Sequence, residues 1–264
     1  MCIKGIVNKD SDMMYAGNIS GNNAGEVWVD DVSNPAFCVV WSKFLEGFHF
    51  MGSPYSQIGK PRLRAFVEDI IIPFLKDKEM SCCEFSCDSQ ELIPFVFDVL
   101  SNYKIDRGKQ YVYRLHDKNN INTNIPCPEG YDIFEINERF INKELLSVDN
   151  RDAIYTDIEK AWGSVERFIQ RGKGYAAIQN NRICSFATTH FRYKDIYSIG
   201  TETFEPYKQK GLSSFLSMSL IKNLASQCAD IWWDCMESNI ASQRTAIKTG
   251  LTFDHEYEVF WFNI

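Results

Sequence analysis

The sequence contains no apolar run that approaches the roughly 20 residues needed for a transmembrane helix. Its first residues, Met1 to Gly5, also lack the apolar segment of a signal peptide. Lysine and arginine number 28 against 35 acidic residues, for a formal net charge of -7. This balance disfavours nonspecific binding to nucleic acid or to an anionic membrane. We therefore expect a cytoplasmic protein that binds neither.

Metal-site and hydrolase patterns are also missing. There are nine cysteines, but no CxxC pair, and no nearby histidine completes a site. Cys82 and Cys83 are adjacent, so on a strand their side chains point to opposite faces. The four histidines are far apart in the sequence, and no Ser-His-Asp or Cys-His arrangement follows from their positions. We expect reduced core cysteines, structural histidines and no metal.

A polar stretch rich in Asn and Pro, residues 117–130, divides the chain into two αβ blocks. We expect an N-terminal αβ domain over residues 1–125 and a second domain over residues 126–264, each long enough to bury a core. The apolar runs predict the order β-β-β-α-β-α-β in the first block. In the second they predict β-α-β-β-β-α-β-α-β-β, a mixed sheet with helices on its faces, so the fold class is α/β (α+β).

Turn and cap residues locate the elements of the second block. A hairpin is predicted to turn at Asn180-Asn181, and Asn239 is predicted to cap a helix that ends at Gly250. The predicted strands are 131–136, 174–179, 183–190, 196–204, 231–236, 252–254 and 258–262, with a long helix over about 210–227.

The most informative segment is the turn between strand 196–204 and that long helix. Amides in the first turn of a helix have no partner inside the helix, and the helix dipole adds positive potential there. The turn is basic and holds one glycine, which lets a ligand approach the backbone closely. These features predict a pyrophosphate site. Its expected residues are Lys208, Gln209, Lys210, Gly211, Leu212, Ser213 and Ser214.

Two segments of the second block resemble GNAT-superfamily N-acetyltransferases. Lys208-Gln209-Lys210-Gly211-Leu212-Ser213 resembles the acetyl-CoA signature Arg/Gln-x-x-Gly-x-Gly/Ala, with Lys208 at the first position and Ser213 at the last. Residues 239–253 resemble the Asn-x-x-Ala…Lys-x-Gly-Phe segment of that superfamily. Both occur in the expected order and element context, which extends the likeness to about residues 130–264. Trp233-Asp234-Cys235 with Asn239 and Ser242 further resembles the zwittermicin-resistance acetyltransferase subfamily.

The resemblance implies acetyl-CoA as cosubstrate, a small-molecule amine as acceptor and direct attack on the thioester. In GNAT proteins two neighbouring strands splay apart to hold the acyl-pantetheine, and here these would be 196–204 and 231–236. Backbone amides around Thr203 and Phe204 would then face the cofactor, and Asn239 would belong to the same site. Residues 1–125 lack the cradle motif, and the likeness makes them a possible degenerate GNAT-like half without acetyl-CoA.

Catalytic roles implied by the resemblance fall on two residues. Glu202, on the splayed strand, is the first candidate for the base that takes a proton from the amine, with Glu205 and Glu237 as weaker candidates. The tyrosine that often serves as acid in this superfamily is replaced here by Ala246, so Ser242, Tyr257 or water would take its place. The missing tyrosine leaves an alternative open, a CoA-binding regulatory module without transferase activity.

Overall fold

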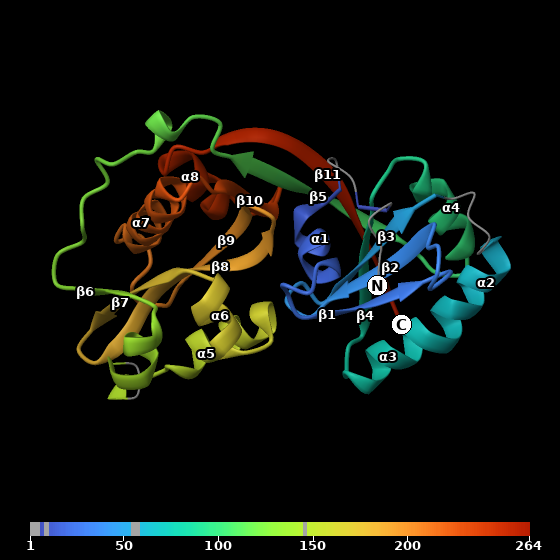
Figure 1. The fold of residues 1–264 in the computed structure, drawn as a ribbon, viewed down its shortest axis with the longest axis horizontal. Coiled ribbons are helices and arrows are strands. Elements are labelled where there is room, and N and C mark those ends of the chain that lie inside the picture. The colour runs from blue at the N-terminus through green and yellow to red at the C-terminus, as the bar shows by residue number, and fades with distance from the viewer. Residues whose placement is uncertain (1–5, 8–10, 54–58, 145–146) are drawn as a thin grey trace. The chain divides into compact units, whose positions relative to one another are not determined.

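The computed structural model describes residues 6–7, 11–53, 59–144 and 147–264 (Figure 1). The chain forms two compact units. Unit 1 comprises Met1–Lys109 with Tyr257–Ile264, and unit 2 comprises Gln110–Glu256. The chain therefore passes from unit 1 to unit 2 within one strand, β5 (Asp106–Arg114), and returns within another, β11 (Thr252–Asn263). Within the described ranges, no helix combines the length and the apolar character needed to cross a membrane.

Unit 1 is a mixed sheet with strand order β1-β2-β3-β4-β11 and a core rich in phenylalanine. Phe48, Phe85 and Phe260 lie at its centre and are fully buried, and the neighbouring strands β2 and β3 are buried on both faces. A helical segment with a π-helical middle connects β3 to β4, which run parallel. The elements are α1 (Met13–Ile19), β1 (Gly25–Val29), β2 (Phe37–Ser42), β3 (Gly47–Gly52), α2 (Gly59–Phe66), η1 (Val67–Ile71), α3 (Ile72–Asp77), β4 (Cys82–Cys87) and α4 (Leu92–Val99).

The strands of unit 2 follow the order β5-β10-β9-β8-β7-β6, with parallel and antiparallel neighbours. Helices α7 and α8 cover one face and α5 and α6 the other (Figure 1). The apolar stripe of α7, including Leu216 and Leu220, packs on Ile199 and Trp233. The elements are η2 (Lys118–Asn120), β6 (Asp132–Glu135), η3 (Phe140–Glu144), α5 (Asp152–Trp162), α6 (Val165–Arg171), β7 (Gly174–Gln179), β8 (Arg182–Tyr193), β9 (Ile196–Thr203), α7 (Leu212–Ser226), β10 (Asp230–Met236) and α8 (Ile240–Lys248).

The parallel pair β9–β10 holds together over only three residue pairs, Ile196–Ser198 with Asp230–Trp232. Beyond them the two strands keep separate partners, since β9 continues along β8 and β10 continues along β5. The splay that the sequence resemblance implies is thus present. The parallel pair of unit 1 behaves differently, because β3 and β4 stay paired to their carboxyl ends, where the Asp88 amide donates to the Phe50 carbonyl at 2.9 Å.

Several local predictions are confirmed. The mixed α/β fold is observed. Asn180 and Asn181 have φ of 50° and 60°, the left-handed values that a type I′ hairpin requires. The Asn239 side chain caps α8 by accepting from the Ser242 amide at 3.1 Å.

Two features differ from the sequence expectations. The separate strands 252–254 and 258–262 are one continuous strand, β11, because the polar residues at its middle are exposed strand residues rather than a turn. The expected division at residue 125 differs from the observed units, since residues 110–125 lie in unit 2 and the last eight residues lie in unit 1, where residues 260–263 pair with β4. Sequence separation could not reveal that return, because strand pairing joins residues distant in the chain.

Gly250 provides a stability test of unit 2. Its φ is +102°, and a Cβ there would overlap the Asn120 carbonyl oxygen. Gly211 also has positive φ (+83°), but a Cβ there meets nothing within 4 Å. We expect Gly250→Ala to lower the free energy of unfolding by about 3 kcal/mol and Gly211→Ala by about 1 kcal/mol. Urea unfolding followed by tryptophan fluorescence measures both, and equal losses would contradict the close approach.

Candidate functional site

Helix α7 begins without a side-chain cap. Its N-cap is Gly211, in the left-handed region, and no side chain accepts from its first amides. Helices α6 and α8, by contrast, are capped by Ser164 and Asn239. The helical geometry leaves the amides of Leu212, Ser213 and Ser214 without partners inside the helix. The first turn of α7 therefore presents backbone donors and the positive end of a helix dipole to whatever lies in front of it.

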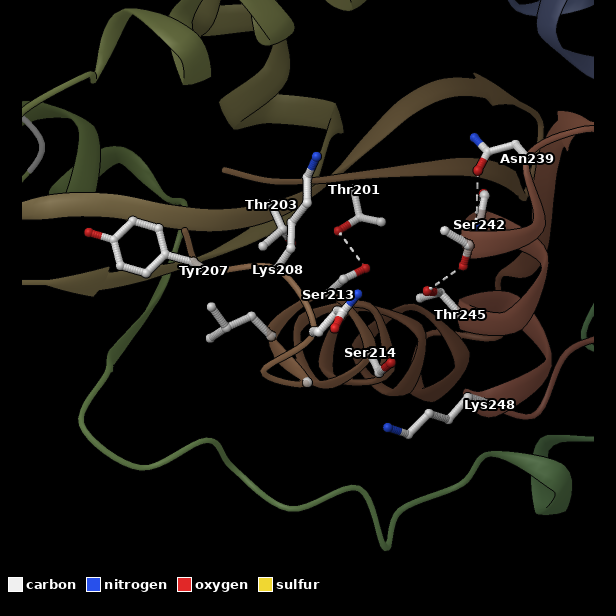
Figure 2. A pocket seen from close by; sticks show the side chains of 14 residues that line it. Thr201, Thr203, Tyr207, Lys208, Ser213, Ser214, Asn239, Ser242, Thr245 and Lys248 are labelled. Carbon is white, nitrogen blue, oxygen red and sulfur yellow. Dashed lines mark hydrogen bonds between the residues drawn. The ribbon is translucent and has the colours of Figure 1, made fainter. Parts of the chain in front are cut away.

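A cavity of about 500 Å³ opens in front of these amides (Figure 2). Its walls come from the end of β9, the β9–α7 turn and one side of α8. Of the residues expected from the sequence, it brings together Thr203, Lys208, Gln209, Gly211, Leu212, Ser213, Ser214, Asn239 and Ser242. A Cβ at Gly211 would meet no atom within 4 Å. The helix terminus is therefore open to the cavity at this position.

The backbone of β9 offers its amides alternately to β8 and to the splayed edge. The Phe204 amide donates to the Cys184 carbonyl at 3.0 Å, so it is not available to a ligand, contrary to the expectation for this residue. Because N–H groups alternate along a strand, those of Thr201 and Thr203 point to the other side, where β10 has diverged. Thr203 therefore keeps its expected place, and Thr201 joins it.

The lysines of the turn do not all face the cavity. Lys208 lies on its wall and its Nζ is 3.0 Å from Glu205 Oε1, in an exposed pair. Lys210, expected to contact the phosphates, instead places its Nζ 5.4 Å from the centre of the Tyr207 ring, and it is not among the residues that line the cavity. The π face of Tyr207 attracts that ammonium group. Lys248, at the end of α8, supplies a second cation on the cavity wall (Figure 2).

Sequence reasoning missed five residues of the cavity wall, namely Thr201, Tyr207, Ala241, Thr245 and Lys248. The signal for most of them is periodic. Thr201 precedes Thr203 by two residues and so shares its face of the strand. Ala241, Thr245 and Lys248 are spaced i, i+4, i+7, which places them on one side of a helix. Such a stripe of small and polar residues next to a capped helix start indicates a helix face that borders open space rather than core.

Ser242 is held between the cap and the core. Its Oγ accepts from the Trp233 indole nitrogen at 2.9 Å, while its amide donates to Asn239. Because the indole occupies an acceptor position, the hydroxyl hydrogen of Ser242 can be donated to another group. Ala246, the position that corresponds to the superfamily's tyrosine, is fully buried in the core of unit 2 and does not border the cavity.

Glu202 does not line the cavity. On β9 it alternates with Thr201 and Thr203 and so lies on the opposite face of the sheet, the face covered by α5. Partial burial raises the pKa of Glu202 above its ordinary value, the negative charge of Asp157 raises it further, and Lys208 lowers it. A carboxylate with a raised pKa is a better proton acceptor near neutral pH. The candidate base and the cavity thus lie on the two faces of one strand.

Unit 1 contains a Ser-His-Asp cluster that the sequence spacing did not reveal. His49 Nδ1 lies 2.7 Å from Ser86 Oγ, and its Nε2 lies 3.6 Å from Asp88 Oδ1. The three residues come from β3, β4 and the residue after β4, strands that the fold brings together. His49 is only 2% exposed and stacks on Tyr15. A substrate could not reach a hydroxyl so placed, and the cluster is a buried polar network rather than a hydrolase centre.

Solved structures share this fold. One is the GCN5-related N-acetyltransferase-like protein from Streptococcus suis 89/1591, which is 18% identical, with a TM-score of 0.64 over 90% of this chain and 88% of that chain. Another is a tandem GNAT protein from the clavulanic acid biosynthesis pathway, which is 9% identical, with a TM-score of 0.59 over 94% of this chain and 87% of that chain. At these identities the likeness establishes a GNAT-type fold.

The sequence makes the assignment more specific. The profile of the GNAT acetyltransferase family matches residues 4–260, so this chain belongs to the GNAT acetyltransferase family. The curated relative, the uncharacterized N-acetyltransferase YdfB of Bacillus subtilis (strain 168), is 26% identical over 137 residues, 52% of this chain. The match spans half the length of that relative.

Replacing Asn239 tests whether its cap holds Ser242 in position at the start of α8. Replacing a capping Asn by Ala costs about 1 kcal/mol of stability. We expect Asn239→Ala and the matched Ser164→Ala at α6 to lose similar stability in thermal unfolding. Only Asn239→Ala should also change the fluorescence of Trp233, whose indole donates to the Ser242 that the cap positions. Identical emission spectra for the two variants would show that the cap does not hold Ser242.

Proposed function

We propose that this protein is an acetyl-CoA-dependent N-acetyltransferase that acetylates the amine of a small molecule by direct attack on the thioester. The observation that carries the proposal is the uncapped start of α7, whose free amides face a cavity next to the splayed strands β9 and β10. Family membership supports acetyl transfer. The geometry supports a ligand with both a phosphate group and a peptide-like chain.

The residues present fit coenzyme A. The amides of Leu212, Ser213 and Ser214 would hold the diphosphate, with charge from Lys208. The outward amides of Thr201 and Thr203 would pair with the pantetheine as an added strand would. Bound acetyl-CoA supplies an activated acyl group to this site. The protein's own contribution is to position that group and to handle protons.

Proton transfer requires a base and an acid. An alkyl ammonium must lose a proton before its nitrogen can attack, and Glu202, with its raised pKa, is the group proposed to accept it. The amine would then approach from the α5 face of β9, opposite the cavity. Ser242, on the cavity side, is proposed to stabilise the leaving thiolate by donating a hydrogen bond until water protonates it, because its hydroxyl hydrogen is not needed for the Trp233 contact.

Unit 1 is proposed to be a degenerate GNAT-like half without a CoA site. Its parallel strands β3 and β4 are joined by a helical segment, as β9 and β10 are joined by α7. However, β4 stays paired with β3 to its own carboxyl end, so no gap opens along β4 for a pantetheine. We expect one CoA bound per chain.

We further propose that the protein belongs to the zwittermicin-resistance subfamily, because of Trp233-Asp234-Cys235 with Asn239 and Ser242. We also propose a cytoplasmic location.

The second candidate function is a CoA-binding regulatory module without transferase activity. The buried Ala246 favours it, because no tyrosine acid can act from that position. The release of CoA thiol over a panel of small amines separates the two functions. Turnover of any amine supports the enzyme, whereas saturable CoA binding with no turnover across the panel supports the module.

Gly211→Trp tests the cradle. The indole would fill the space in front of the α7 amides, so we expect the Kd for CoA to rise at least ~30-fold, about 2 kcal/mol. Gly21→Trp is the matched control, because Gly21 also has positive φ (+73°) and open space around it but lies in unit 1. Isothermal titration calorimetry measures both. An unchanged Kd for CoA in Gly211→Trp would show that the diphosphate binds elsewhere.

Glu202→Gln tests the base. We expect kcat to fall about 10²-fold while the Kd for CoA stays nearly constant. In the wild type, kcat/KM should be full above the pKa of Glu202 and decline as pH falls through it, at a pH higher than the ordinary ~4.3 of a glutamate. Glu237→Gln, at an exposed carboxylate just after β10, is the control. An unaltered pH profile in Glu202→Gln would exclude this residue from proton transfer.

A further inference from the structure

Asp157 of α5 lies on the same face of unit 2 as Glu202 and has a defined set of partners. Thr188 Oγ1 donates to its Oδ2 at 2.6 Å, and His190 Nε2 lies 3.0 Å from its Oδ1. Both oxygens are therefore engaged by residues of β8. The Asp157 side chain is 14% exposed and the His190 side chain 13%. A carboxylate held at both oxygens and mostly shielded from water is fixed in position, and its field is little screened by salt.

Gly200 makes this arrangement possible. It pairs with Thr188 across the β8–β9 ladder, and a Cβ at this position would overlap the His190 ring. The missing side chain lets the imidazole lie across β9 and reach Asp157. A β-bulge between Thr189 and Phe191 re-aims His190 at this point of β8. A glycine in the middle of a strand weakens it, so its presence here has a structural reason.

The register places Asp157 beside Glu202. Glu202 pairs with Phe186, and Gly200 pairs with Thr188, so both β9 residues lie on the face where Thr188 contacts Asp157. Two residues along a strand span roughly 7 Å. Because Thr188 holds the Asp157 carboxylate beside Gly200, that carboxylate lies roughly 7 Å along the strand from Glu202. At that separation a shielded charge acts appreciably on a neighbouring carboxylate.

We propose that Asp157, fixed by Thr188 and His190, is a positioning residue for Glu202. Its fixed negative charge strengthens Glu202 as a proton acceptor. The same charge attracts a cationic amine to this face of β9. The inference rests on the proposed function in taking Glu202 as the base. It also narrows the acceptor class, because paired carboxylates on one face favour an ammonium ion over a neutral or acidic acceptor.

The charges around Glu202 agree with this role. Burial alone raises the pKa of Asp157, but His190 and Thr188 outweigh it and hold the pKa below its ordinary value, so Asp157 stays ionised at neutral pH. Two charged groups act on Glu202. Asp157 from α5 raises its pKa, and Lys208 from the β9–α7 turn lowers it. Removing the Asp157 charge leaves burial alone to oppose Lys208, so the pKa of Glu202 must fall.

A direct titration of Glu202 tests the proposal without relying on activity. The protein is labelled with ¹³C at glutamate carboxyls, and the Glu202 signal is assigned by its loss in Glu202→Gln. We expect Asp157→Asn to lower the pKa of Glu202, because the negative charge that raises it is removed. Asparagine keeps the shape of the side chain and can still accept from Thr188. Glu159→Gln, an exposed residue on the same helix, removes the same charge and should leave the titration unchanged.

The activity profile provides the second measurement. The acidic limb of kcat/KM should move to lower pH in Asp157→Asn by the shift seen in the titration, and not in Glu159→Gln. An unshifted Glu202 titration in folded Asp157→Asn overturns the inference, even if acetyl transfer is observed. A shifted titration without transfer to any amine supports the inference about the charge and counts against the proposed function instead.

A second variant covers the case in which Asp157→Asn does not fold. Thr188→Val is nearly isosteric and removes one donor to the Asp157 carboxylate. We expect a change in the Glu202 titration smaller than in Asp157→Asn but larger than in Glu159→Gln, because the Asp157 charge is then held less firmly. A Glu202 titration in Thr188→Val that matches Glu159→Gln would overturn the inference.

Discussion

The short pairing of β9 with β10 is the constraint on which the candidate site depends. After Ser198 and Trp232 the two strands stop sharing hydrogen bonds, yet each remains paired on its outer side, β9 with β8 and β10 with β5. The sheet can therefore open in its middle without losing either strand. The backbone groups on the inner edges of the gap have no ladder partner, and an extended chain with amides of its own satisfies them best. Unit 1 shows the contrasting case, in which the parallel pair stays closed.

The two helices beside the gap begin in opposite ways, and the difference defines the character of the cavity. Helix α8 is capped by the side chain of Asn239, which accepts from the Ser242 amide. Helix α7 begins at Gly211 with no capping side chain. Of these two helices, α7 is the one without a capping side chain, and its start faces the cavity whose opposite wall is the polar stripe of α8. In the proposed function an anion would complete the α7 terminus, and α8 would form the facing wall of the cavity.

The period-two geometry of β9 divides the chemistry between two faces. Thr201 and Thr203 face the cavity with α7 and α8, whereas Gly200 and Glu202 face α5, β8 and the Asp157–His190 pair. A donor held on one face and an acceptor arriving at the other would meet at the splayed edge. The division also explains why the candidate base is absent from the cavity wall. A strand cannot present consecutive side chains to the same side.

Much of the architecture follows from local residue patterns. The Asn180-Asn181 turn, the Asn239 cap, the open Gly211 terminus and the mixed sheet of unit 2 each result from a local conformational preference, and such preferences are written in neighbouring residues. Tertiary packing decided which residues that are distant in the sequence become neighbours. The Phe204 amide donates to Cys184 in the β8–β9 ladder, and Lys210 lies against the Tyr207 ring. Strand β11 returns to unit 1. The bulge in β8, together with Gly200, brings His190 to Asp157. Local propensity acts within a few residues, whereas strand register and side-chain contact depend on which distant segments become neighbours.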